Sequence, residues 1–219
     1  MKIYAINGSP RKNKNTATLL DRALEGAKSA FPNGNVETER INLYDLNYTG
    51  CKGCFACKVK GGKSYGKCAV KDDLFQVLEK LSSADGIIIG SPIYYRTITG
   101  QLHSFLERWL FPYMTYKIGY PTIAPKRMKT VCIYSMNVLQ DEMLAGGYRD
   151  NLAMFEMFIE SYFQKPKILE VYNTVQFDDY SRYVCETFNE KDKMNYKEQH
   201  FQNDCKKAFE VGKQMMLQE

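Results

Sequence analysis

The sequence is poor in residues on which several classes of catalyst depend. It has two histidines among 219 residues, and both of them, His103 and His200, fall in or beside segments expected to be helical. This scarcity argues against a histidine metal centre and against a serine hydrolase triad. Neither the phosphate-binding pattern Gly-x-x-x-x-Gly-Lys-Ser/Thr nor the dinucleotide-binding pattern Gly-x-Gly-x-x-Gly occurs. Any nucleotide site must therefore be built differently.

Long apolar runs and strong charge are also missing. No segment reaches the length needed to cross a bilayer, and the start, MKIYAINGSPRKN, lacks the apolar stretch of a signal peptide. The net charge is only +5, and no expected helix carries a continuous Lys/Arg stripe. Seven cysteines, an odd number, indicate a reducing compartment. We therefore expect a cytoplasmic protein with no nucleic-acid or membrane partner.

Segments typical of strands alternate along the chain with segments typical of helices. Strands are expected at residues 1–7, 36–43, 87–89, 130–135 and 168–175. Helices are expected from Thr16, after Asp72 and at residues 98–110, 150–163 and 199–217. Such alternation is typical of an α/β fold with a mostly parallel sheet. With 44% hydrophobic residues, residues 1–219 suit a single domain with its own core.

Three segments interrupt this alternation. They are a cysteine-rich insertion at 50–70, an aromatic and proline-rich stretch at 111–127, and a polar, tyrosine-rich stretch at 177–199. Irregular segments of this length in a compact domain are usually lids, binding loops or subunit contacts. The aromatic stretch has few obvious partners within one domain, so we expect it to support a homo-oligomer, most simply a two-fold dimer.

Ligands of open parallel sheets bind beyond the carboxyl ends of the strands. The loops 7–16, 91–99 and 135–142 lie at such ends. The first, NGSPRKNKNT, offers hydroxyl, amide and guanidinium groups together with free helix N–H groups, which suits a phosphate. A capped strand-to-helix turn without a ligand is the alternative. In the second loop, Tyr94 and Tyr95 offer a flat aromatic wall for a heterocycle. A phosphate at the first strand and a planar ring at the third is the arrangement of a mononucleotide flavin site.

The stretches GSPRKNKNTATLL and SPIYYRTITGQLHSFLERW, with the cysteine loop between them, carry a resemblance to a known family. Together they resemble the flavodoxin-fold NAD(P)H-dependent FMN reductases, in particular the iron–sulfur flavoprotein branch. The resemblance covers residues 1–110 and is thin after 136. It implies a flavodoxin-like three-layer sandwich, with a five-stranded parallel sheet in the order 2-1-3-4-5 and helices on both faces.

The same resemblance implies the cofactor, the reaction and the site residues. FMN would take reducing equivalents from NADH or NADPH and pass them to a quinone, a flavin or another acceptor, with no catalytic side chain. The alternatives are an electron carrier between protein partners and a flavin-free interaction module. The residues implied are Ser9, Arg11, Asn15 and Thr16 at the phosphate, Pro92, Ile93 and Tyr94 beside the ring, Thr99 and Gly100 in the following turn, and Ser135, Met136 and Asn137 as a third wall.

The cysteine loop, CKGCFACKVKGGKSYGKC at 51–68, poses a separate question. Cys51, Cys54 and Cys57 form a C-x₂-C-x₂-C run typical of cluster ligands, and Cys68 supplies a fourth sulfur. Ten residues separate Cys57 from Cys68, more than in the iron–sulfur branch. A 4Fe-4S cluster, free thiols or an oxidised pair, and zinc all remain open, and the long gap weighs against the cluster.

Overall fold

Five parallel strands form the centre of the protein, whose residues 1–217 are described by a computed structural model. The strands are β1 (Lys2–Asn7), β2 (Glu37–Asn42), β3 (Gly86–Pro92), β4 (Lys129–Ser135) and β5 (Lys167–Val171). They are hydrogen-bonded in the order β2-β1-β3-β4-β5, and every neighbouring pair is parallel. This arrangement confirms the flavodoxin-like sheet expected from the sequence.

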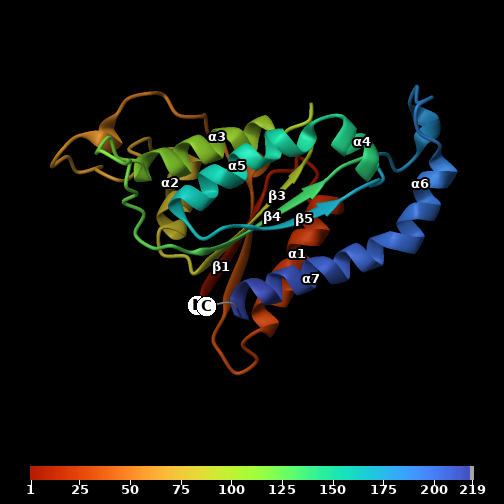
Figure 1. Cartoon of the computed structure of the whole chain (residues 1–219), viewed down its shortest axis with the longest axis horizontal. Helices are drawn as coiled ribbons and strands as arrows, with labels where there is room; N and C mark the ends of the chain where they lie inside the picture. Colours follow the sequence, from red (N-terminus) through yellow and green to blue (C-terminus); the bar gives the residue numbers. More distant parts are fainter. Residues whose placement is uncertain (218–219) are drawn as a thin grey trace.

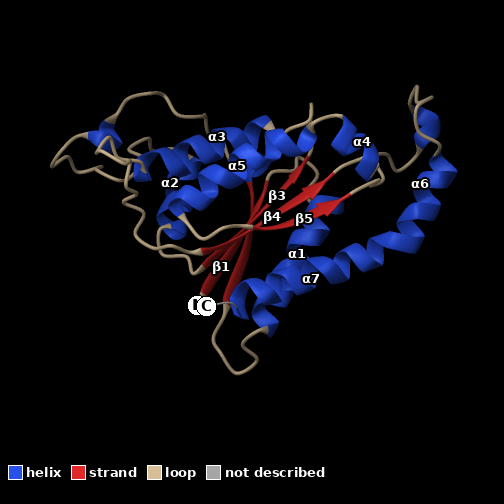
Figure 2. Cartoon of the chain, in the orientation of Figure 1, coloured by secondary structure: helices blue, strands red, loops and turns tan. Residues whose placement is uncertain are grey.

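Helices cover both faces of the sheet, which gives the three expected layers (Figures 1 and 2). The helices are α1 (Asn15–Ser29), α2 (Asp73–Leu81), α3 (Gly100–Leu110), α4 (Gln140–Ala145), α5 (Tyr148–Tyr162), α6 (Glu190–Tyr196) and α7 (Gln202–Leu217). In Figure 1, α2, α3 and α5 lie on one side of the sheet, and α1 and α7 lie on the other. No helix among residues 1–217 is long and apolar enough to span a membrane.

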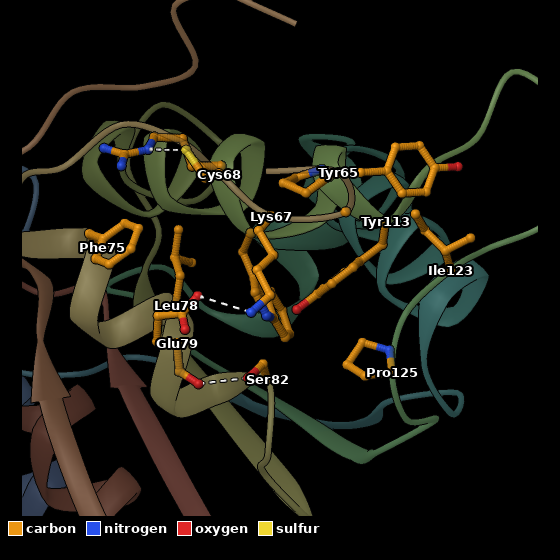
Figure 3. A pocket seen from close by; sticks show the side chains of 14 residues that line it. Tyr65, Lys67, Cys68, Phe75, Leu78, Glu79, Ser82, Tyr113, Ile123 and Pro125 are labelled. Atoms are coloured by element: carbon orange, nitrogen blue, oxygen red, sulfur yellow. Dashed lines mark hydrogen bonds and ion pairs between the residues drawn. The ribbon is translucent and has the colours of Figure 1, made fainter. Parts of the chain in front are cut away.

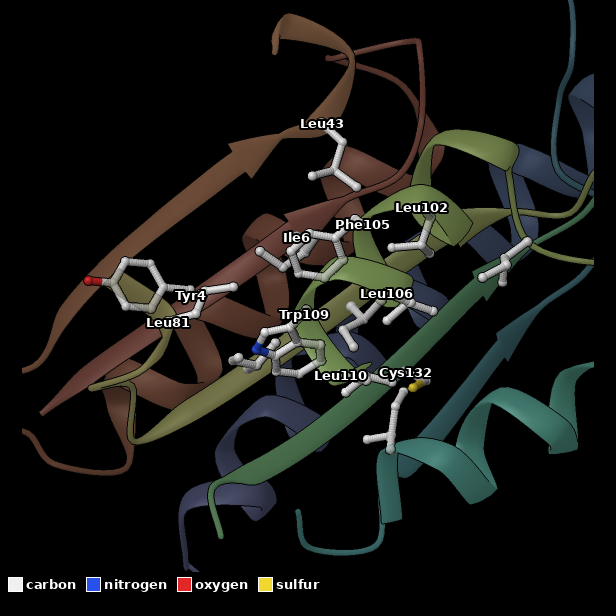
Figure 4. Packing of buried hydrophobic residues seen from close by; sticks show 14 of the residues in the cluster. Tyr4, Ile6, Leu43, Leu81, Leu102, Phe105, Leu106, Trp109, Leu110 and Cys132 are labelled. Atoms are coloured by element: carbon white, nitrogen blue, oxygen red, sulfur yellow. The ribbon is translucent and has the colours of Figure 1, made fainter. Parts of the chain in front are cut away.

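Two hydrophobic cores, one on each face, explain why β3 is apolar throughout. Ile87 and Ile89 belong to the core that contains α2, α3 and α5, while Ile88 belongs to the core that contains α1 and α7. A strand buried on both faces needs apolar side chains at consecutive positions. In the first core, Trp109 stacks between Phe105 and Phe163. The ring centroids of Phe105 and Trp109, both labelled in Figure 4, are 5.5 Å apart.

The second core depends on an unusually close approach of α1 and α7. A Cβ atom at Gly26 of α1 would lie 1.9 Å from the backbone oxygen of Phe209, and one at Gly212 of α7 would lie 2.0 Å from that of Ala23. Real Cβ atoms do not reach such distances, so each helix needs a glycine where its partner's backbone crosses. The two glycines therefore let the backbones of the first and last helices touch.

The structure corrects the sequence-based boundaries in the last third of the chain. The strand expected at 168–175 ends at Val171, because Asn173 adopts a left-handed φ of 51° that breaks the extended backbone. The segment 177–199 is not irregular throughout, since it contains α6. The Asn189 side chain accepts a hydrogen bond from the backbone of Asp192, which caps this helix. This Asn followed by Glu and Asp is a helix-start pattern that the sequence already carried.

Candidate functional site

The loop after β1 is a tight turn fixed by side chains. The Asn7 side-chain oxygen accepts from the Ser9 backbone N–H at 3.1 Å, and Ser9 Oγ accepts from the Arg11 backbone N–H at 3.1 Å. A Cβ at Gly8 would lie 3.0 Å from the backbone oxygen of Gly90, so a glycine allows β1 and β3 to remain close at this point. The chain is thereby directed from the sheet edge straight into α1.

The start of α1 is suited to an anion. Lys14 occupies the capping position, where its side chain makes no capping hydrogen bond to the helix, and the first turn contains no acidic residue. The first N–H groups of a helix have no intrahelical acceptor, and its dipole favours negative charge there. Arg11 and Lys14 add two cationic side chains, and both line a cavity at this end of the sheet. This combination of cations and free N–H groups is the one a phosphate group requires.

Of the two tyrosines in the loop after β3, one lines the cavity and the other does not. Tyr94 and Thr97 pair through both backbone groups, at 2.8 and 3.0 Å. Between them, Tyr95 and Arg96 have φ values of 48° and 65°, a two-residue turn normally made by Asn or Gly. A backbone of this kind is strained for larger residues and is commonest at functional sites. Tyr94 lines the cavity, whereas Tyr95 is fully exposed and does not.

Two buried hydroxyl contacts tie the strand ends together. Thr99 Oγ1 donates to the Gly8 oxygen at 2.8 Å and accepts from the Leu102 N–H, so it caps α3 while holding the first loop. The hydroxyls of Thr16 and Ser135 lie 2.8 Å apart and join α1 to β4. These residues are buried and form the support of the site.

A cavity of about 440 Å³ opens between the three loops. We call it the strand-end cavity. Of the predicted residues, its lining includes Arg11, Pro92, Ile93, Tyr94, Ser135, Met136 and Asn137. The predicted residues outside its lining are Ser9, Asn15, Thr16, Tyr95, Thr99 and Gly100. The sequence reasoning missed Lys14, Thr174, Gln176, Phe177, Asp178 and Tyr183.

The missed residues come mainly from the segment that follows β5. Arg11 donates to the backbone oxygen of Gln176, and Asn15 Nδ2 donates to that of Val175 at 2.9 Å. Lys14 Nζ lies 2.6 Å from Asp178 Oδ1, and this contact lowers the pKa of Asp178. β5 ends at the same sheet edge as β4, so its loop belongs to the site by topology. Treating the loop after the fifth strand like the other three would have found these residues.

Asn137, which lines the cavity, carries a covered side-chain oxygen without a hydrogen-bond partner among the described residues. Its Nδ2 donates to Gln176 Oε1 at 3.1 Å, while its buried Oδ1 has no hydrogen-bond partner among residues 1–217. An unpaired buried acceptor is costly unless a ligand or water supplies a donor. Lys193, which is only 4% exposed, donates to the Asn137 backbone oxygen and to Asn173 Oδ1, and so holds this loop in place.

The cysteine loop lies along α3, where the Cys51 backbone N–H donates to Glu107 Oε2 at 2.9 Å. All four of its cysteines line one cavity of about 20 Å³, which we call the four-cysteine cavity. Cys51 and Cys54 are exposed and Cys57 is buried, and this burial raises the pKa of the Cys57 thiol. Within the described part of the chain, however, no three His, Cys, Asp or Glu side chains are grouped so that they could hold a metal ion.

Arg108 of α3 anchors this loop. Its guanidinium is 1% exposed and forms a bidentate ion pair with Asp72. It also donates to the backbone oxygens of Thr49 and Val70 at 3.2 and 3.1 Å, and Nε lies 3.4 Å from Cys68 Sγ. All five N–H groups of the guanidinium therefore have acceptors. A buried charge in this setting fixes the loop ends rather than binding a ligand.

One lysine of the cysteine loop, Lys58, is directed into the protein. Its ammonium group donates to the backbone oxygens of Phe111, Pro112 and Met114, just after α3. Burial lowers its pKa. Lys58 thus joins the cysteine loop to the aromatic segment 111–127.

The chain is similar in sequence to curated proteins that are named as iron–sulfur flavoproteins. The chain is 40% identical over 108 residues to an iron–sulfur flavoprotein of Methanocaldococcus jannaschii, which is 49% of this chain and 51% of the relative. It is 32% identical over 147 residues to an iron–sulfur flavoprotein of Archaeoglobus fulgidus, which is 67% of this chain and 60% of the relative. The chain thus matches about half the length of these curated relatives.

Solved structures show the same fold at low sequence identity. An NAD(P)H:quinone oxidoreductase from Methanothermobacter marburgensis superposes with a TM-score of 0.69 at 13% identity, covering 100% of this chain and 98% of the other. An azoreductase from Bacillus anthracis gives 0.67 at 14% identity, covering 97% and 99%. The model of the NADPH-dependent FMN reductase family matches residues 1–143. Because this match covers more than half of the sequence, including the loops after β1, β3 and β4, the chain belongs to the NADPH-dependent FMN reductase family.

Proposed function

We propose that the strand-end cavity binds FMN and that the protein uses it to pass reducing equivalents from NADH or NADPH to an acceptor. The observation that carries the proposal is the cavity itself, which is lined by Arg11 and Lys14 beside the start of α1 and by the ends of β3 and β4. The cations and the helix start fit a phosphate, and the strand ends offer a wall for a planar ring. The family to which the chain belongs supports the same cofactor.

Each part of the cavity has a role in this proposal. Arg11, Lys14 and the start of α1 hold the phosphate. Pro92, Ile93 and Tyr94 bound the ring on the β3 side, and Ser135, Met136 and Asn137 bound it on the β4 side. Phe177 and Tyr183 line the cavity as a stacked pair with centroids 4.0 Å apart, and we expect them to shield the ring from water. When bound, FMN supplies the hydride-accepting centre, so the chain provides positioning and shielding. The acidic side chain in the lining, Asp178, is paired with Lys14.

Anaerobic reduction tests the proposal. Adding NADPH, and NADH in a parallel sample, to FMN-loaded protein should bleach the visible flavin band rapidly, and adding a quinone should restore it. Flavin that stays oxidised with both nucleotides would instead make the protein a carrier between protein partners. Protein that cannot be loaded with FMN would make the fold an interaction module and refute the assignment of the cavity.

An iron–sulfur cluster is not part of the proposal. The four cysteines converge on one small cavity, as a cluster requires, but as they lie no three of them are grouped to hold a metal ion. The ten-residue gap before Cys68 is the feature that separates this loop from a compact cluster motif. We expect the cysteines to act as thiols or as an oxidised pair.

Iron and sulfide assays on protein prepared without oxygen test this prediction. We expect no stoichiometric iron in the wild type, and we expect Cys54→Ser to change thiol titration while leaving FMN in place, because the two sites use different loops. Four irons per chain, lost in Cys54→Ser, would contradict the prediction and assign the loop to a cluster.

Assembly and compartment complete the proposal. Tyr116, Ile118 and Tyr120 of the segment 111–127 are exposed, and we propose that they form the contact of a homodimer. All seven cysteines are free, which suits a reducing cytoplasm. The acceptor class suggested by the quinone oxidoreductase with the same fold is a small molecule.

A further inference from the structure

A second cavity, of about 430 Å³, lies between α2, α3 and the segment 111–127. We call it the α2–α3 cavity, and it shares no lining residue with the strand-end cavity. Its size is within the range of small-molecule sites, which combine apolar walls with a few placed polar groups. The apolar walls are made by Phe75, Leu78, Pro112, Ile123 and Pro125 (Figure 3 labels all but Pro112). A flat apolar molecule would fit such walls.

Tyr113 supplies a hydrogen-bond donor to this cavity. The residue is 7% exposed, and its hydroxyl has no hydrogen-bond partner in the part of the chain that the structure describes. Burial, and to a lesser extent the charge of Glu79, raise the pKa of the Tyr113 hydroxyl to about 12. The hydroxyl therefore keeps its proton at neutral pH, and a ligand carbonyl can accept from it.

Glu79 supplies the complementary acceptor. Its carboxylate lines the cavity and has one ionic contact, with Lys67 Nζ at 3.7 Å, which leaves acceptor capacity on both oxygens. Figure 3 shows Lys67 and Tyr113 converging on the middle of the drawn side chains, with Glu79 on the α2 side. A carboxylate acceptor near a phenolic donor matches a ligand edge that carries a carbonyl next to an N–H.

Three other polar side chains of the lining, Arg108, Ser82 and Trp109, are engaged or covered. Arg108 uses every guanidinium N–H within the protein. The hydroxyl of Ser82 donates to the Glu79 backbone oxygen at 2.7 Å. The indole N–H of Trp109 has no partner among the described residues, but neighbouring atoms cover it, so it reports on the cavity without contacting a ligand.

We propose that the α2–α3 cavity is a binding site for a small planar heterocycle with a cyclic amide edge. The ring carbonyl accepts from the Tyr113 hydroxyl, the adjacent ring N–H donates to the Glu79 carboxylate, and the ring is enclosed by the apolar walls. Cys68 lines both this cavity and the four-cysteine cavity. A bound heterocycle therefore lies against the wall of the cysteine loop, remote from the strand-end cavity.

Quinolin-2-one, a bicyclic cyclic amide, is the probe that tests the proposal. Trp109 is the sole tryptophan, so ¹⁵N-labelled full-length protein gives one indole N–H signal, and this signal belongs to the cavity. Titration with quinolin-2-one should shift the signal saturably. Tyr113→Phe should weaken binding roughly 3- to 10-fold, the value of one hydrogen bond. N-methylquinolin-2-one, which cannot donate to Glu79, should bind the wild type more weakly by a similar factor.

A matched variant separates this site from general effects of losing a hydroxyl. Tyr162→Phe removes the hydroxyl of another largely buried tyrosine that does not line the cavity, and it should leave the affinity for quinolin-2-one unchanged. The indole signal itself verifies that each variant is folded. No saturable shift in the wild type, or equal affinity in the wild type and Tyr113→Phe, would overturn the proposal. Equal affinity for the two quinolinones would overturn the role of Glu79.

Discussion

In the proposed function, single charged side chains decide how the strand-end cavity binds an anion and keeps its shape. Arg11 and Lys14 bring positive charge to the start of α1, and both are oriented by the segment after β5. Lys193 of α6 is not in the lining, and it holds the loop that carries Asn137. The site therefore depends on cations from segments far apart in the sequence.

Arg11→Ala should weaken FMN binding about 10- to 100-fold, since a charge-assisted hydrogen bond contributes about 1.5–3 kcal/mol. Titration of apoprotein with FMN, followed by flavin fluorescence, measures the change. Lys12→Ala is the matched control, because Lys12 pairs with Asp45 and does not line the cavity. Equal losses in the two variants would show that general charge, and not the placement of Arg11, matters.

Lys193 should impose a pH dependence on stability. Burial lowers the pKa of this ammonium group from an ordinary value of 10.5 to about 8, with Glu142 and Cys185 acting in the opposite direction. Between these two pH values the unfolded chain holds a proton that the folded chain has lost, so the free energy of unfolding rises with pH. Relative to Lys193→Met, the wild type should therefore gain stability from pH 8 to pH 10.

Urea denaturation of both proteins across this range checks the prediction. Lys191→Met, a change on the exposed side of the same helix, should give a curve parallel to that of the wild type. A Lys193→Met curve that also stays parallel to the wild type would contradict the lowered pKa.

At the scale of elements, the order of strands and helices could be predicted from the sequence, and the boundaries late in the chain could not. The β-branched run of β3 and the helical spacing of α1 are local patterns, so they were readable without tertiary information. The end of β5 depends on one backbone angle at Asn173. The loop that contains Arg11 predicts its place in the site. Its hydrogen-bond partner Gln176 lies 165 residues later in the sequence, and no local pattern joins the two.

The contact between α1 and α7 gives a prediction about an element pair. Gly212→Ala should destabilise the protein by several kcal/mol, because the new methyl group would meet the Ala23 backbone at 2.0 Å. Gly100→Ala is the matched control, since its Cβ meets nothing within 4 Å, and it should change stability little. Chemical denaturation measures both. A small effect at Gly212 would show that the helices can separate without cost.

At the scale of the whole molecule, the segment 111–127 lies at the end remote from α4 and α6 (Figure 1). It exposes Tyr116, Ile118 and Tyr120, and Lys58 attaches this segment to the cysteine loop. A surface of this kind favours self-association. The dimer expected from the sequence would then bring two cysteine loops toward a common interface.

Light scattering at micromolar concentration should give the mass of a dimer for the wild type and of a monomer for Ile118→Lys. Val184→Lys supplies the control, because Val184 is as fully exposed as Ile118 but lies in a different segment. A monomeric wild type would refute the proposed contact, and dissociation by both variants would show an effect of added charge alone.

The glycine contact between α1 and α7 also bears on the order of events during synthesis. A ribosome completes β1, the phosphate loop and α1 long before α7 emerges, and until then the face of α1 that meets Gly212 stays exposed to water. The helix at whose start the anion is proposed to bind packs on the sheet, and its packing is completed only when α7 has been made. Nascent chains that lack α7 should be clients for chaperones and should retain little FMN, so we expect cofactor loading to follow the synthesis of α7.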